Sequence, residues 1–170
     1  MNIFILGAGR VGKSVAESLV SEKSDITVID TDAQRLRALQ ERLDLRGVAG
    51  NGIQPSVLEV AGARDAYMLI ACASADETNL VACKVAHEVL RIHTRIARVR
   101  SPEFKRGSKL MATEGFAVDE VFVLAATKDI RRVLNALRRR DQPVRRVMIA
   151  GGGRGGPRLA RRCSASAASS

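Results

Sequence analysis

Aromatic side chains are scarce in this 170-residue chain, making up 3% of it with no Trp. This scarcity argues against base-stacking platforms for single-stranded nucleic acid. No apolar run approaches the roughly 18 residues of a membrane span, and residues 1–4 lack the basic start of a signal peptide. The three cysteines, Cys72, Cys83 and Cys163, are odd in number and far apart, which indicates a reducing compartment. We therefore expect a soluble, cytosolic protein.

Positive charge is concentrated at the end of the chain. Residues 1–127 carry 16 Lys and Arg against 16 Asp and Glu, so the net charge of +10 resides in residues 128–170. A basic segment of this kind can contact nucleic acid or acidic lipid. It contains no nucleic-acid docking motif, so we expect a solvated helix face and an unstructured end, with no nucleic-acid partner.

Short apolar runs alternate with amphipathic stretches over residues 1–115. The apolar runs predict strands at 3–6, 26–29, 48–49, 67–71 and 95–99. Helical spacing predicts helices at 11–20, from Asp32 as N-cap to about Leu43, at 55–60 and at 78–90. Strands that alternate with helices through short loops pair in parallel with right-handed crossovers. The pattern therefore predicts an α/β fold with a Rossmann-like, doubly wound parallel sheet, followed by a short C-terminal extension.

The pattern changes after residue 115. We expect a strand at 121–124, a helix at 129–140 that ends before Pro143, and a strand at 147–150. The last of these begins an internal repeat, in which six residues recur 144 positions later: Ile5, Gly7, Gly9, Arg10, Gly12 and Ala16 as Ile149, Gly151, Gly153, Arg154, Gly156 and Ala160. The repeat then decays into a low-complexity run that cannot supply further strands.

A glycine-rich motif lies directly between the first predicted strand and the first predicted helix. Its sequence is Gly7-Ala8-Gly9-Arg10-Val11-Gly12. The first glycine permits a tight turn, the second lets backbone approach a pyrophosphate, and the third lets the helix pack closely on the strand. The helix N-terminus presents free N–H groups to phosphates. The alternative is a sharp turn that needs small residues for structural reasons alone.

Asp30 ends the second predicted strand, 18 residues after Gly12. A carboxylate at this place accepts hydrogen bonds from an adenosine ribose. The alternative role, N-cap of the next helix, is one that Thr31 or Asp32 can fill. Because a carboxylate repels a 2′-phosphate and no Arg immediately follows it, we expect NAD(H) or another unphosphorylated-ribose adenine nucleotide rather than NADP(H).

Further candidates lie in loops at the carboxyl ends of the later strands, where parallel sheets bind ligands. Ala73 and Ser74 are small enough to pass under a nucleotide, although Ser74 and Asp76 are equally suited to helix capping. Arg98 and Arg100 share a face, and either can reach a phosphate or form an ordinary surface ion pair. The turn at 50–52 also borders this crevice.

Nothing in the sequence points to catalysis or to a metal. Cys72 and Cys83 lie in apolar stretches without a CxxC partner, and His87 and His93 lack metal-ligand spacing. We expect no catalytic residues and no metal site.

These motifs together resemble a known family. The residues that carry the resemblance are 4–12, 26–30, 75–79 and 95–102, and it extends over about residues 1–115. They are similar to the first nucleotide-binding domain, of the RCK or KTN type, of the bacterial Trk potassium-uptake regulatory subunit (the TrkA family). The resemblance implies nucleotide contacts from residues 7–11, Asp30, Ala73, Ser74 and Arg98.

The resemblance also implies a function. It is that of a cytoplasmic regulatory subunit, peripheral at the inner face of the plasma membrane, that gates a membrane potassium transporter in response to NAD(H) or ATP/ADP. We expect no enzyme activity, because the residues after the sheet cannot readily supply a catalytic domain, and we expect a homo-oligomer. The alternatives are a small NAD-dependent oxidoreductase and a product that binds no nucleotide.

The chain departs from the family pattern near Gly115. We expect residues 1–115 to form the nucleotide-binding domain. Residues 116–146 resemble the remnant of a small ligand-sensing domain, and residues 147–170 the truncated start of a second nucleotide-binding repeat. Such an arrangement implies an internal deletion, after which nucleotide binding by residues 1–115 is expected to survive.

Overall fold

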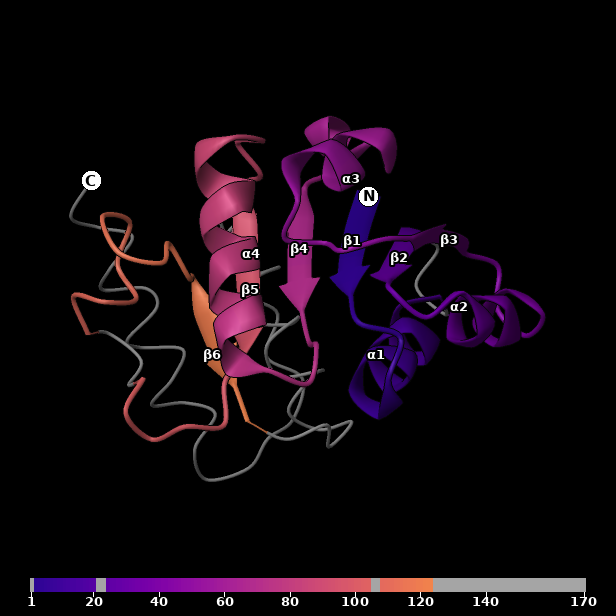
Figure 1. Cartoon of the computed structure of the whole chain (residues 1–170), viewed down its shortest axis with the longest axis horizontal. Coiled ribbons are helices and arrows are strands. Elements are labelled where there is room, and N and C mark those ends of the chain that lie inside the picture. The colour runs from indigo at the N-terminus through magenta and orange to yellow at the C-terminus, as the bar shows by residue number, and fades with distance from the viewer. Residues whose placement is uncertain (1, 21–23, 105–107, 124–170) are drawn as a thin grey trace, which may run out of the picture. The chain divides into compact units, whose positions relative to one another are not determined.

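The computed structural model describes residues 2–20, 24–104 and 108–123. These residues form a sheet of parallel strands in the order β3-β2-β1-β4-β5-β6 (Figure 1). The strands are β1 (Asn2–Leu6), β2 (Asp25–Asp30), β3 (Arg46–Ala49), β4 (Met68–Ala71), β5 (Thr94–Arg98) and β6 (Glu120–Phe122). Because β4 pairs with the opposite side of β1 from β2, the strand order reverses between β1 and β4. That reversal is where a doubly wound sheet opens a ligand crevice.

Helices make the crossovers that parallel pairing requires. They are α1 (Arg10–Val20), α2 (Ala33–Gln40), α3 (Pro55–Val60) with the short 3-10 helix η1 (Ala63–Asp65), and α4 (Asp76–Glu88). Asp32 caps α2 by accepting hydrogen bonds from the Gln34 and Arg35 amides, as its position predicts. The doubly wound α/β fold expected from the sequence is confirmed, with element bounds that shift by a few residues.

The central strands are buried on both faces, as their continuous apolar sequences indicate. Phe4, Leu6 and Leu69 pack in one cluster with Leu58 of α3 and Leu80 of α4. Alternate side chains of a strand point to the opposite face, where α1 and α2 contact β1, β2 and β3. Helices thus cover both faces of the sheet, and the carboxyl ends of its strands remain open between them.

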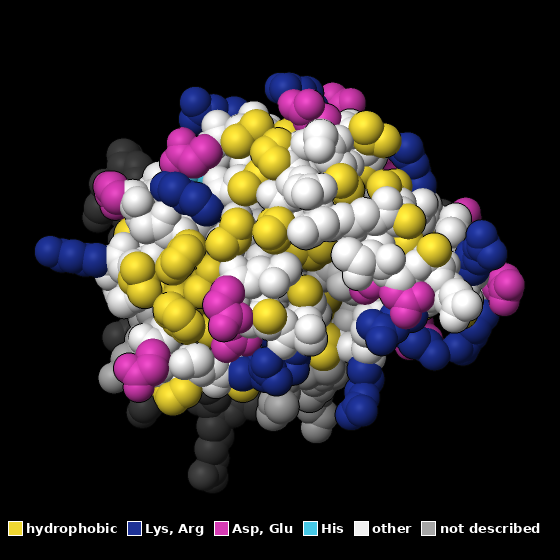
Figure 2. All heavy atoms as spheres, in the orientation of Figure 1, with side chains coloured by type: hydrophobic (Ala, Val, Ile, Leu, Met, Phe, Trp, Pro, Cys, Tyr) yellow, Lys and Arg dark blue, Asp and Glu magenta, His cyan; other side chains and the backbone are white. Residues whose placement is uncertain are grey.

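One side of α4 remains apolar and exposed. Figure 2 shows hydrophobic side chains gathered over this helix, where Val81 and Val89 are 39% and 42% exposed. Val85, between them at helical spacing, is half-buried. These three valines form the α4 valine stripe, in which Val85 packs partly against the core, while Val81 and the C-cap residue Val89 are exposed.

The sheet extends past residue 115, where the sequence pattern changes. β6 pairs in parallel with β5, and Ile96 lies opposite Glu120. Buried Arg95 holds the turn before β6: its guanidinium pairs with Asp119 at 2.9 Å and donates to the carbonyl of Ala117 at 2.6 Å. The strand predicted at 121–124 is therefore present as the last strand of this sheet. The predictions for 124–170, including the helix at 129–140 and the repeat, lie outside the described residues.

Candidate functional site

The first and third glycines of the motif shape the loop between β1 and α1. Gly7 has φ +105°, a conformation that L side chains rarely adopt, and its amide donates to the carbonyl of Ile29 at 2.8 Å. A Cβ on Gly12 would lie 1.7 Å from the carbonyl oxygen of Gly7. Both positions therefore need glycine for reasons internal to the fold.

The second glycine is different. Among the described residues, no atom apart from those of its own chain neighbours lies within 4 Å of a Cβ placed on Gly9, and the φ of Gly9 is outside the left-handed region. The fold itself gives no steric or conformational reason for glycine at this position. Gly9 also lines a pocket.

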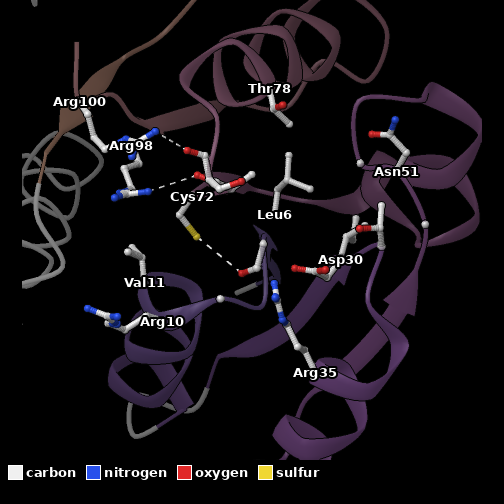
Figure 3. A pocket seen from close by; sticks show the side chains of 18 of the residues that line it. Leu6, Arg10, Val11, Asp30, Arg35, Asn51, Cys72, Thr78, Arg98 and Arg100 are labelled. Atoms are coloured by element: carbon white, nitrogen blue, oxygen red, sulfur yellow. Dashed lines mark hydrogen bonds between the residues drawn. The ribbon is translucent and has the colours of Figure 1, made fainter. Parts of the chain in front are cut away.

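This pocket has a volume of about 700 Å³ and opens at the carboxyl ends of the strands (Figure 3). Its size is within the range of small-molecule and cofactor sites. The lining residues come from the ends of all six described strands and the segments that follow them: Leu6, Gly7, Gly9, Arg10, Val11, Ile29, Asp30, Thr31, Arg35, Gly50, Asn51, Gly52, Cys72, Ala73, Ser74, Thr78, Arg98, Arg100 and Val123.

Asp30 ties the end of β2 to the glycine loop. Its Oδ2 accepts a hydrogen bond from the Ala8 amide at 2.6 Å, and its Oδ1 accepts one from the Asp32 amide at 2.8 Å. The carboxylate is thus fixed at the pocket wall, and each oxygen retains a lone pair for a further donor. Asp32 caps the helix, so Asp30 is not needed for that role.

The pocket lining is strongly cationic, with four arginines and one carboxylate. Arg35 pairs with Asp32 at 3.1 Å, and Arg100 lies 3.5 Å from Asp76. Arg98 forms no ion pair with any acidic residue in the described part of the chain. Its contact is a 3.4 Å hydrogen bond to the Ala73 carbonyl, and its buried Nε has no hydrogen-bond partner there. A guanidinium that lines the pocket without a neutralising carboxylate favours an anionic ligand.

The first turn of α4 connects the two strand ends on the far side of the pocket. Asp76 is buried, and its Oδ2 accepts hydrogen bonds from the amides of Arg100 and Ser101, each at 2.8 Å. Burial alone would raise the pKa of Asp76, but the Ser101 and Arg100 amides and the Arg100 guanidinium hold this pKa below its ordinary value. Asp76 is therefore a carboxylate that braces the chain after β5 and does not cap α4, whose N-cap is Ala75.

The described residues include two buried thiols, that of Cys72 at the pocket and that of Cys83 in the core. Cys72 lines the pocket floor, with its Sγ 3.8 Å from the Gly7 carbonyl oxygen. Burial raises the pKa of Cys72 and of Cys83 to about 12, although Arg98 and Arg95 oppose this shift at the respective thiols. Both are protonated near neutral pH, which suits the packing role expected for them.

The residues predicted for the site converge on one place. Eight of them line the pocket, while Ala8 donates to Asp30 from behind it and Gly12 is buried beneath the loop. Arg100 and residues 50–52 also line it, as expected. Sequence reasoning missed Arg35, which reaches the pocket from α2, and the buried Asn79, which hydrogen-bonds to Ala73 and Arg98. Asn79 lies in the segment 75–79 that carries the family resemblance, but its partner Arg98 is 19 residues further along the chain.

Two negative findings concern the part of the chain that the structure describes. No group of three or more His, Cys, Asp or Glu residues there could hold a metal ion. No helix in the same ranges is long and apolar enough to cross a membrane.

Solved structures share this fold. The TrkA-N domain of the inner membrane protein YbaL from Escherichia coli is 22% identical, with a TM-score of 0.62, over 80% of this chain and 95% of that one. The GsuK channel bound to NAD is 20% identical, with a TM-score of 0.59, over 71% of this chain and 21% of that one.

Relatives matched by sequence have higher identities to this chain than these structures have. The Trk system potassium uptake protein TrkA of Halomonas elongata is 49% identical over 136 residues, which is 79% of this chain and 30% of that protein. The TrkA protein of Haemophilus influenzae is 45% identical over 71% of this chain and 27% of its own length. This chain thus spans less than a third of either relative. The model of the TrkA-N domain matches residues 3–124, so the chain belongs to the TrkA-N domain family.

Proposed function

We propose that this chain is a nucleotide-sensing regulatory domain whose pocket binds an adenine nucleotide, NAD(H) or ATP/ADP, without chemical turnover. The observation that carries the proposal is Gly9. The fold does not require glycine there, whereas a pyrophosphate lying against the loop backbone would. The GsuK channel, which has the same fold, is recorded bound to NAD, and this supports NAD as one candidate ligand.

Different residues of the pocket suit the phosphates and the ribose of such a nucleotide. Residues 7–11 and the unpaired Arg98 would bind phosphates, with Arg10 and Arg100 at the rim and Ala73 and Ser74 beneath. Asp30 would accept hydrogen bonds from the ribose hydroxyls. Arg35 brings positive charge near this end, but Asp32 already pairs with it, so we still expect NADPH to bind more weakly than NADH.

The regulated process is potassium uptake through a membrane transporter subunit. The names of the relatives from Halomonas and Haemophilus support this part of the proposal. The chain would work as a cytoplasmic subunit at the inner face of the plasma membrane. A nucleotide would gate the transporter only through a difference in its affinity for two conformations of the regulatory assembly.

A second copy of this chain is the partner we propose for assembly. The α4 valine stripe supports it, because three valines at helical spacing form an apolar face suited to pairing with its own copy. Light scattering at working concentration tests the proposal: a dimer or higher oligomer is expected, and a monomer contradicts it.

The expected domain boundary at residue 115 is too early, because β6 belongs to this sheet and the TrkA-N model matches residues 3–124. In this proposal the rest of 116–146 is the remnant of a ligand-sensing domain, and 147–170 is the start of a second nucleotide-binding repeat. The alignment with the TrkA protein of Vibrio alginolyticus supports a gapped relationship. It extends over 250 residues at 34% identity and includes 95% of this chain. An alignment of that length with a 170-residue chain requires long gaps.

Calorimetric titration with NADH, NAD, NADPH and ATP in parallel tests the proposed function. We expect NADH or ATP to bind and NADPH to bind much more weakly. Gly9→Asp places a carboxylate in the phosphate space and should abolish binding. Val60→Asp adds the same charge at a site that is 74% exposed and outside the pocket lining, and should bind like the wild type.

Three results would overturn the proposal. A folded wild-type chain that binds none of the four nucleotides would show that the glycine loop is structural only. If Gly9→Asp binds nucleotide as tightly as the wild type, the nucleotide does not lie against the glycine loop. Oxidation of NADH by a panel of carbonyl compounds, lost in Gly9→Asp, would establish an oxidoreductase instead.

A further inference from the structure

Asn79 is a completely buried carboxamide in the second turn of α4, with 0% of its surface exposed. Its Oδ1 accepts a hydrogen bond from the Ala73 amide at 2.8 Å. Its Nδ2 donates to the carbonyls of Ala73, at 3.1 Å, and of Arg98, at 2.9 Å. These bonds use three of the four hydrogen bonds that a carboxamide can make.

The two backbone segments that Asn79 joins belong to neighbouring strand ends. The ladder between β4 and β5 ends at the pair Ala71 and Ala97. Beyond it the strands separate, and Ala73 and Arg98 both line the pocket. The Asn79 side chain joins the two segments by hydrogen bonds at a place where no ladder pair between β4 and β5 connects them.

Local structure does not account for an Asn at this position. Asn is a weaker helix former than Ala or Leu, and the buried residues that follow it on α4 are the apolar Leu80, Ala82, Cys83 and Ala86. An apolar side chain would serve packing, but it would leave the polar groups of Ala73 and Arg98 without these partners. The carboxamide therefore serves the strand ends rather than the helix.

We propose that Asn79 is a positioning residue of the nucleotide site, whose carboxamide sets the distance between the Ala73 loop and Arg98 so that both contact one ligand. The inference rests on the proposed function. It assigns no ligand contact to Asn79 itself, which is absent from the pocket lining. Its effect on affinity passes through the backbone of Arg98, the arginine whose Nε lacks a partner in the described residues.

Asn79→Asp tests this inference, because Asp has nearly the shape of Asn but different hydrogen bonding. An ionised carboxylate can still accept from the Ala73 amide, but it cannot donate to the two carbonyls. Burial beside those carbonyls raises the pKa of the new carboxyl group, and below this pKa the protonated group regains one donor. Binding by the variant should therefore improve relative to wild type as the pH falls.

The measurement is the dissociation constant for NADH at several values between pH 6.0 and 8.5, for wild type and variants of the full chain. We expect Asn79→Asp to raise it about tenfold or more at pH 8.5, as the loss of two hydrogen bonds implies. The ratio to wild type should fall towards one as the pH is lowered. Leu80→Ala, at the adjacent and equally buried position, should lower the melting temperature and keep the wild-type affinity at every pH.

The outcomes separate the inference from the proposed function. Two results overturn the inference alone, provided that the wild type binds NADH. In one, the ratio of the Asn79→Asp dissociation constant to that of the wild type is the same at every pH. In the other, Leu80→Ala loses as much affinity as Asn79→Asp. A folded wild type that binds no NADH overturns both. If Asn79→Asp does not fold, Asn79→Ser removes the carboxamide without adding charge. It should weaken binding about tenfold at all pH values, and wild-type affinity in that variant would overturn the inference.

Discussion

Replacing either of two glycines in one motif by alanine should have opposite consequences, because Gly9 precedes α1 and Gly12 is buried in its first turn. In Gly12→Ala the added methyl would lie 1.7 Å from the oxygen and 2.9 Å from the carbon of the Gly7 carbonyl. Both atoms are backbone, so α1 must move away from the loop. In Gly9→Ala the same methyl meets nothing within 4 Å and projects into open space beside the pocket.

The expected magnitudes follow from these contacts. Overpacking at Gly12 should lower the free energy of unfolding by about 1–3 kcal/mol. For a domain of this size, each kcal/mol lowers the melting temperature by about 4 °C. Gly9→Ala should change the free energy of unfolding by less than about 1 kcal/mol, because lower chain entropy in the unfolded state offsets a slightly poorer helix N-terminus. It should weaken NADH binding by about 1–3 kcal/mol, since the methyl occupies the space of the phosphates.

Urea unfolding and NADH titration of the two variants and wild type measure both quantities. Gly9→Ala should keep the wild-type unfolding midpoint and lose affinity, whereas Gly12→Ala should lose stability. A Gly9→Ala variant that is destabilised as much as Gly12→Ala would refute the assignment of open space at Gly9. Wild-type affinity in Gly9→Ala would refute the assignment of that space to phosphates.

Three further predictions concern side chains of the pocket and core. Asp30→Ala should weaken NADH binding by about 1–3 kcal/mol, the scale of hydrogen bonds to a charged group, and an unchanged dissociation constant would remove the ribose assignment. Because the folded-state pKa of Asp76 is lowered from 3.8, its ionised form stabilises the fold above that pH, and this contribution is lost as the pH falls through the folded-state pKa. Asp76→Asn should accordingly be less stable than wild type at pH 7 and equally stable in acid. Unfolding curves at both pH values check this, and a gap that persists in acid would contradict it. In a Cys163→Ser background, Cys72 and Cys83 should resist a thiol reagent at pH 8 until the chain is denatured, since burial raises both pKa values to about 12, and rapid labelling of the native chain would contradict their protection.

Local signals in the sequence were sufficient for most of the fold. The apolar run at residues 3–6, the glycine loop and the capping Asp32 each act over a few neighbouring residues, and the structure confirms them. The convergence of the predicted site residues follows from the same signals, because parallel strands bring their carboxyl ends to one edge of the sheet.

What sequence reasoning missed depends on partners that are distant in the chain. Asn79 acts on the backbone of Arg98, and buried Arg95 depends on Asp119 across a long loop. Likewise, the apolar pattern at 121–124 predicts the strand that the structure places at Glu120–Phe122, but the pattern does not say that this strand pairs with β5. Periodicity identifies a strand locally, whereas the choice of its neighbour is a property of the whole sheet.

The reversal of strand order between β1 and β4 divides the pocket between two stretches of the chain. Its lining residues up to Gly52 come from one stretch, and those from Cys72 onward come from the other. The connection between them passes through the exposed turn at Gly62. A nucleotide bound across this reversal would hold together two peptides produced by a single cut at that turn. Ligand occupancy and reassociation of the fragments would then be one linked equilibrium, in which each strengthens the other by the same free energy.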